Sequence, residues 1–167
     1  MTFLTNGLAT HLPASERKEA ARQLGDIGPT AKAAVPVLVQ ALEGTDLLLV
    51  DEIVIALKKI GEDPETYLPR LKMLLQANDE HSRVNAAARV LDVAPADHEA
   101  HLVLMKMIKS RSVYQRFAAD TLGEAGPAAA EAIPVLREAA ENSSQQSVKD
   151  AARRALKRIK AKPAVTN

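Results

Sequence analysis

Residues 24–29, which read Leu-Gly-Asp-Ile-Gly-Pro, recur at residues 122–127 as Leu-Gly-Glu-Ala-Gly-Pro. Between and beyond these two copies runs a column of apolar residues whose members lie 33, 33, 32 and 34 residues apart: Ile27, Ile60, Val93, Ala125 and Ile159. A fixed spacing of this size is typical of proteins built from repeated structural units. The spacing therefore predicts five copies of one unit, near residues 1–26, 27–60, 61–93, 94–125 and 126–160.

Each repeat reads as two helices joined by a turn. In the first helix, apolar residues recur at helical spacing, as in Val35, Leu38, Val39 and Leu42. In the second helix, pairs of alanines precede the apolar column, and such small side chains permit a close approach between helices. The pattern therefore predicts antiparallel helix pairs.

Turn-forming residues mark the helix ends. Asp46 and Asp79 stand where an aspartate can cap the next helix. The second helices stop at glycines that can serve as C-caps, namely Gly28, Gly61 and Gly126. Three prolines fall inside the first helices and predict a kink there, namely Pro36, Pro69 and Pro134.

The composition of the 167-residue chain agrees with a helical protein. Alanine and leucine, both strong helix formers, occur 30 and 20 times, whereas the chain has only four aromatic residues and no cysteine or tryptophan. A β-sandwich needs many β-branched and aromatic residues, and a disulfide-rich miniprotein needs cysteines. These classes are excluded, and a disordered chain would be far less apolar.

Three segments, 20–29, 82–87 and 147–156, combine the alanine pairs with the positions around them. In this pattern the chain resembles the HEAT repeat family, in its short HEAT-like or phycobilisome-lyase-type form. The resemblance implies an all-α fold: a right-handed α-solenoid of about five antiparallel helix pairs, or about ten helices. It also implies a single domain over residues 1–160, followed by a flexible tail at 161–167. In HEAT proteins the second helices form the concave face.

No stretch approaches the roughly 18 consecutive apolar residues of a membrane span. The first residues also lack the basic start of a signal peptide. We therefore expect a cytoplasmic protein that does not bind membranes.

One short segment contains residues that occur in catalytic and metal sites. His98 and His101, three residues apart, could share a helix face and ligate a metal. No comparable motif supplies further ligands, and His98-Glu99 is the only His-Glu dyad, whereas the iron-dependent HEAT-like hydroxylases use four. An exposed polar helix start is the favoured interpretation. We expect no metal, no cofactor and no catalysis, with a metal-dependent HEAT-like enzyme or a lyase-type subunit as less favoured alternatives.

A helical wheel separates the two sides of the second helices. With Ala20, Leu24 and Ile27 facing inward, a set of charged and apolar residues faces outward. Either flanking helices cover the apolar residues of this set, or these residues form a groove for a partner's helix or peptide, and both interpretations stay open. In such a groove Tyr114 and Phe117 would be the main contact residues. The candidate partner-binding residues are Glu19, Arg22, Leu48, Glu52, Ile55, Asn85, Val113, Tyr114, Phe117 and Asp120.

The charge of the chain is unevenly distributed. Residues 149–162 carry a net charge of +6, although the whole chain carries only +1. The candidate basic patch consists of Lys149, Arg153, Arg154, Lys157 and Arg158. Such a patch could bind a phosphate backbone or an acidic partner, but terminal repeats of solenoids also need a polar outer face, and this capping role is favoured.

The residues and the resemblance together favour a non-catalytic scaffold that binds another protein or peptide on the concave face formed by the second helices. Binding of nucleic acid or of an acidic partner through the last helix is the alternative and is not favoured.

Overall fold

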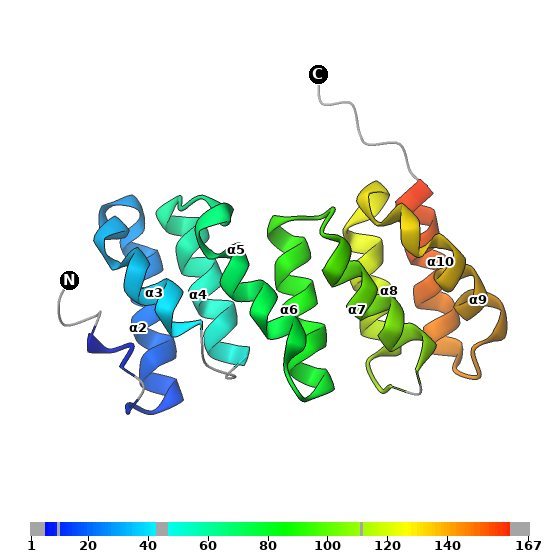
Figure 1. The fold of residues 1–167 in the computed structure, drawn as a ribbon, viewed down its shortest axis with the longest axis horizontal. Helices are drawn as coiled ribbons and strands as arrows, with labels where there is room; N and C mark the ends of the chain where they lie inside the picture. The colour runs from blue at the N-terminus through cyan, green and yellow to red at the C-terminus, as the bar shows by residue number, and fades with distance from the viewer. Residues whose placement is uncertain (1–5, 10, 43–46, 111, 161–167) are drawn as a thin grey trace, which may run out of the picture. The chain divides into compact units, whose positions relative to one another are not determined.

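The computed structural model describes the backbone of residues 6–9, 11–42, 47–110 and 112–160, and the side chains of the same residues except 47 and 48. Every regular element in these ranges is helical (Figure 1). The prediction of an all-α protein is therefore confirmed, whereas the expected tail at 161–167 lies outside the described residues. None of the described helices has the length and apolar character needed to cross a bilayer.

Contacts divide the chain into two compact units, Met1–Leu74 and Leu75–Asn167, and each is described by itself. In the first unit, α2 packs along α4, and the short 3-10 helix η1 and α3 also contact α4. The elements of this unit are α2 (Ala14–Ile27), η1 (Gly28–Ala34), α3 (Val35–Ala41), α4 (Leu47–Ile60) and α5 (Pro64–Met73).

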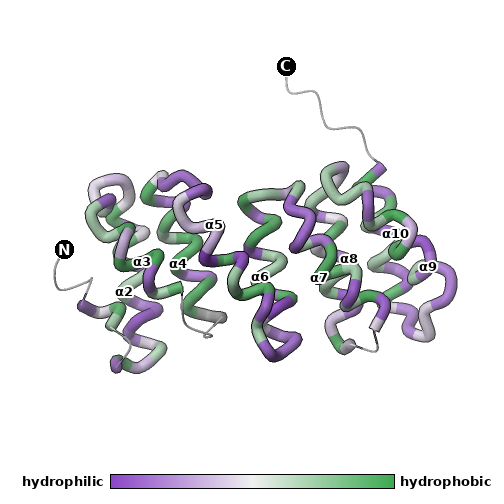
Figure 2. The backbone as a smooth tube through the Cα atoms, viewed as in Figure 1, coloured by the Kyte–Doolittle hydropathy of each residue, from purple (hydrophilic) through white to green (hydrophobic). Residues whose placement is uncertain are grey.

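In the second unit, α10 packs against both α8 and α9, and α7 contacts α6, α8 and α9. Its elements are α6 (Glu80–Val93), α7 (His98–Lys109), α8 (Gln115–Glu124), the 3-10 helix η3 (Gly126–Ala132), α9 (Ile133–Asn142) and α10 (Gln146–Lys160). A further 3-10 turn, η2 (Leu74–Gln76), lies at the boundary of the units. Hydrophobic and hydrophilic residues alternate along the helices, as expected for helices buried on one side (Figure 2).

Two glycines lie where one helix closely approaches another. A Cβ atom at Gly25 of α2 would lie 2.8 Å from Cα of Ala56 on α4. A Cβ atom at Gly123 of α8 would lie 2.7 Å from Cα of Ala155 on α10. Both distances are too short for any side chain, so each helix pair meets with backbone almost against backbone. The second helices thus approach closely at these glycines and at the alanines opposite them, Ala56 and Ala155, rather than at the predicted alanine pairs.

The helix ends follow the expected chemistry. Gly28, Gly61 and Gly126 have φ of 70°, 79° and 62°, a left-handed conformation that suits a glycine C-cap. The Asp79 carboxylate accepts a hydrogen bond from the backbone N–H of Ser82 at 2.7 Å and so caps α6. Asp46, the other predicted cap, lies outside the described residues.

Two details differ from the sequence-based expectation. Pro36 and Pro134 do not kink a helix, because each lies in the first turn of α3 or α9, after a separate 3-10 helix. A first turn needs no N–H from proline, so the ring is accommodated there; only Pro69 lies inside its helix. Ile27, expected to face inward, is 41% exposed, because α2 ends at this residue and the chain turns into η1.

Candidate functional site

The candidate residues of the first unit lie on α2 and α4. Glu19 and Arg22 are exposed on α2, whereas Glu52 on α4 is half-buried and lies 3.8 Å from the Lys18 ammonium. Ile55 is 42% exposed, although most of α4 around it is buried. The side chain of Leu48 lies outside the described residues.

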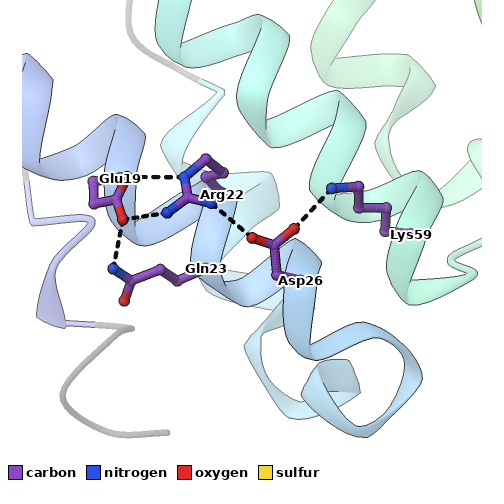
Figure 3. A network of polar contacts seen from close by, with 5 residues as sticks. All are labelled: Glu19, Arg22, Gln23, Asp26 and Lys59. Atoms are coloured by element: carbon purple, nitrogen blue, oxygen red, sulfur yellow. Dashed lines mark hydrogen bonds and ion pairs between the residues drawn. The ribbon is translucent and has the colours of Figure 1, made fainter.

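The charged residues of this surface pair with one another in a network (Figure 3). Arg22 donates two hydrogen bonds to Glu19, at 2.6 and 2.9 Å, and a third to Asp26 at 2.8 Å. Asp26 also accepts a hydrogen bond from Lys59 of α4 at 2.8 Å, and Glu19 accepts one from Gln23. The network therefore links α2 to α4 across the outer side of their contact.

These hydrogen bonds change the pKa of Glu19. Hydrogen bonds from Arg22 and then Gln23 lower the pKa of Glu19 from 4.5 to about 2, because they stabilise its charged form. We expect Arg22→Ala to raise this pKa back toward its ordinary value, as measured by carbon-detected NMR titration of the Glu19 carboxyl. Lys32→Ala, an exposed cation elsewhere in the unit, is the control and should leave it unchanged. A pKa of Glu19 unmoved by Arg22→Ala would contradict the network.

The second unit has several candidate residues on α8 and beside its start, and we call this region the α8 surface. Phe117 is 41% exposed on α8, and Val113, just before the helix, is 85% exposed. Tyr114, at the N-cap of α8, lies with its ring 5.5 Å from the ring of His81 on α6. Asn85, on α6 like His81, donates a hydrogen bond to the His81 backbone carbonyl at 2.8 Å, and the ring contact of His81 with Tyr114 places α6 beside the start of α8.

An ion pair joins the α8 surface to the basic helix. Asp120 accepts a hydrogen bond from Arg154 of α10 at 2.9 Å and lies 3.7 Å from the guanidinium of Arg116. Arg153 turns the other way and donates to the backbone carbonyl of Ala140 on α9 at 3.3 Å. The structure therefore unites the two predicted sites at Asp120.

The basic residues of α10 do not form one stripe. Its buried side contacts α8 and α9, and Arg154 and Arg153 leave it in opposite directions, toward those two helices. Lys157 and Arg158 are exposed, and Lys149 is half-buried. The cations of α10 therefore lie on both sides of its buried face. They do not form a single row that could follow a phosphate backbone.

The histidine segment is held by one carboxylate. Nδ1 of His98 and Nδ1 of His101 lie 2.7 Å from the two carboxylate oxygens of Glu131 in η3. His101 is only 1% exposed and its Nε2 also lies 2.9 Å from the carbonyl oxygen of Pro95. The interpretation as an exposed helix start is thus right for His98 and wrong for His101. The sequence does not show that Glu131 lies beside the His101 ring and binds it in a buried position.

The cluster links α7 to η3. The residues that the structure describes contain no group of three or more His, Cys, Asp or Glu side chains arranged to hold a metal ion. The arrangement can hold α7 against η3 through hydrogen bonds, which is a structural role.

Sequence reasoning missed Arg116 and Glu131 as members of these groups. A signal for some such contacts was present in the repeat itself. Three of the inter-helix contacts join residues about one period apart: Asp26 with Lys59, His98 with Glu131, and Asp120 with Arg154, separated by 33, 33 and 34 residues. Pairs of complementary charge at this spacing could have been sought directly.

Comparison with known proteins agrees with the repeat pattern. The family model for HEAT repeats matches residues 1–92 of the chain. A search of curated proteins found no match. Since the model covers more than half of the sequence, the chain belongs to the HEAT repeat family.

Proposed function

We propose that the protein is a non-catalytic interaction scaffold, built as a right-handed α-solenoid of about five antiparallel helix pairs over residues 1–160. Stacked repeats in solenoids offer an extended surface to a partner, and HEAT repeats in general serve protein interaction. The partner would be another protein or a peptide that binds the outward residues of the second helices.

The observation that carries the proposal is the exposure of Phe117. Phe117 is 41% exposed, and Val113 near it is still more exposed. Among the described residues, no helix covers this apolar surface. Aromatic residues of this kind are enriched in binding hot spots. Ile55, 42% exposed on α4, gives the first unit a similar feature.

The alternative of nucleic-acid binding through α10 has weaker support. Arg154 is paired with Asp120, and Arg153 with Asp150 and a backbone carbonyl. These contacts engage two of the five candidate cations within the protein and divide them between two sides of the helix.

We expect Phe117→Asp to weaken capture of the physiological partner by at least about tenfold, since losing a hot-spot residue typically costs about 2 kcal/mol or more of binding energy. Affinity capture followed by quantitative mass spectrometry, with wild-type and variant proteins side by side, measures the effect. Ile55→Asp tests the first unit in the same way.

Leu102→Asp is the matched control, because Leu102 is 48% exposed on α7, a first helix. Circular dichroism confirms that all three variants keep their helicity. A captured set that is the same for Phe117→Asp, Ile55→Asp and the wild type would refute the proposed binding surface.

A further inference from the structure

His101 is a titratable residue that is buried between two hydrogen-bond partners. Its side chain is 1% exposed. Nδ1 of the ring lies 2.7 Å from Oε1 of Glu131, and Nε2 lies 2.9 Å from the carbonyl oxygen of Pro95. Within the described part of the chain the ring has no other polar partner, so these two oxygens determine where its protons lie.

Both oxygens accept hydrogen bonds. The Pro95 carbonyl has no proton to donate, and an ionised carboxylate has none either. Burial raises the pKa of Glu131, but hydrogen bonds from His101 and His98 lower it more, to below 4.5, so this carboxyl is ionised at neutral pH. A neutral imidazole has one N–H and one lone pair, and in either tautomer the lone pair would face an acceptor. Only a ring with protons on both nitrogens satisfies the two contacts.

The contact with Glu131 also has the length of a charged hydrogen bond. Such bonds between a cationic nitrogen and a carboxylate oxygen are typically about 2.7–2.9 Å long, and the separation here is 2.7 Å. An isolated cation would be costly at this depth, but the carboxylate beside the ring supplies the opposite charge. The geometry therefore fits a buried ion pair.

His98 shares the same carboxylate without needing a second proton. Its Nδ1 lies 2.7 Å from the other oxygen of Glu131, and its side chain is 68% exposed. Water can therefore solvate its Nε2 in either protonation state, and the neutral tautomer with a proton on Nδ1 already makes the contact. The single negative charge of Glu131 is thus available to pair with His101.

Other charged groups do not compete for the His101 ring. Helices α6, α8 and α9 and the 3-10 helix η3 pack against α7, and Glu131 is the one ionisable residue of η3. On α7 itself, Asp97 and Glu99 accept hydrogen bonds from the Ala100 backbone and from Gln76. On α6, α8 and α9 every ionisable side chain is exposed or has another partner. The half-buried ones are Glu80 with Ser112, Arg83 with two backbone carbonyls, Arg89 with Asp92, and Asp120 with Arg154.

We infer that the buried His101 ring is an imidazolium that pairs with Glu131, and that this pair makes the contact between α7 and η3 sensitive to pH. As the pH falls, Glu131 takes up a proton and its charge is lost. As the pH rises, His101 releases a proton to solvent, and a lone pair then faces an acceptor oxygen. Because α7 and η3 belong to consecutive predicted repeats, the pair controls how firmly one repeat holds the next. This inference does not depend on the proposed binding function.

The first test is the protonation state of His101 in the full-length wild-type protein. Long-range proton–nitrogen correlation NMR distinguishes a protonated ring nitrogen from an unprotonated one. We expect both nitrogens of His101 to be protonated at about pH 7.5, where an ordinary histidine, with a pKa of about 6.5, is mostly neutral. The chain unfolded in urea should show neutral histidines at the same pH. An unprotonated His101 nitrogen in the folded protein at this pH would overturn the inference.

Glu131→Gln tests whether the carboxylate holds the second proton. The new amide has nearly the same shape, but its NH2 group can donate to an unprotonated Nδ1. We expect the His101 ring of this variant to keep the proton on Nε2 and lose the one on Nδ1 at about pH 7.5. Glu141→Gln, which changes an exposed glutamate of α9, is the control and should leave both protons in place. A doubly protonated His101 in Glu131→Gln would contradict the pairing.

The dependence of stability on pH provides a measurement independent of the NMR signals. Between about pH 7 and pH 9 the folded wild type keeps a proton that the unfolded chain has released, so its stability falls as the pH rises. We expect its folding equilibrium constant, from urea unfolding, to fall by about tenfold over this range relative to that of Glu131→Gln. Glu141→Gln should follow the wild type. Parallel curves for the wild type and Glu131→Gln would overturn the inference, and if Glu131→Gln does not fold, the wild-type spectrum decides.

Discussion

Gly123→Ala is expected to lower the free energy of unfolding by about 2 kcal/mol. In most helices this change is favourable by up to about 1 kcal/mol, because alanine has the higher helix propensity. Here the new Cβ atom would lie 2.7 Å from Cα and 3.0 Å from Cβ of Ala155. Overpacking of this kind costs about 1–3 kcal/mol, and backbone atoms cannot rotate away as a long side chain can. The clash therefore outweighs the propensity, and urea unfolding measures the difference.

A second substitution separates the clash from other effects of losing a glycine. Gly61→Ala also loses a glycine, but nothing lies within 4 Å of its added Cβ atom, and only its φ of 79° opposes the change. It should cost about 1 kcal/mol, the usual penalty of a left-handed conformation. Gly123→Val should be worse than Gly123→Ala, because it adds further atoms at the same contact.

The partner residue provides the decisive variant. Ala155→Gly removes the Cβ atom that would lie 3.0 Å from the new methyl group, although Cα remains. In the double variant with Gly123→Ala, we expect the combined loss to be smaller than the sum of the single losses. A stabilising Gly123→Ala, or strict additivity in this cycle, would show that α8 and α10 do not meet this closely.

The features that sequence predicted best depend on local chemistry. Gly28, Gly61 and Gly126 end helices because a residue without a side chain adopts positive φ at little cost, and this need is visible in the chain itself. Asp79 caps α6 for an equally local reason. The repeat period then indicates which of these local signals correspond to one another.

The features that sequence missed depend on contacts between helices. The burial of His101 is decided by Glu131, thirty residues away, and a helical wheel drawn for α7 alone contains no such partner. Asp120 is half-buried, and its pairing with Arg154 depends on how closely α8 and α10 approach. The exact position of each helix end also matters, as the exposure of Ile27 shows.

Glu131→Ala is expected to destabilise the protein by about 1–3 kcal/mol at neutral pH. The substitution removes the partner of the His98 ring and, more seriously, of the nearly inaccessible His101 ring. A buried polar atom that loses its hydrogen bond keeps the cost of its dehydration. Nε2 of His101 keeps the Pro95 carbonyl as its partner, whereas no other partner of Nδ1 is found in the described part of the chain. The orphaned atom would be Nδ1.

The pH dependence of this loss follows from the carboxylate. Burial raises the pKa of Glu131, but hydrogen bonds from His101 and His98 lower it more, so its pKa lies below the ordinary value of 4.5. A carboxylate with a lowered pKa stabilises the folded state above its unfolded-state pKa, and the stabilisation is lost as the pH falls through the folded-state pKa. The difference between wild type and Glu131→Ala should thus be full at neutral pH and shrink below about pH 4.5.

Two control variants make the assignment specific. Glu141→Ala removes an exposed glutamate near the end of α9 and should change stability by less than about 0.5 kcal/mol. His98→Ala should cost less than Glu131→Ala, because the His98 side chain is 68% exposed and water can replace it around the carboxylate. If Glu131→Ala cost no more than Glu141→Ala at neutral pH, the carboxylate could not be what holds His101 in place, and the link between α7 and η3 would have to rest on their apolar contacts alone.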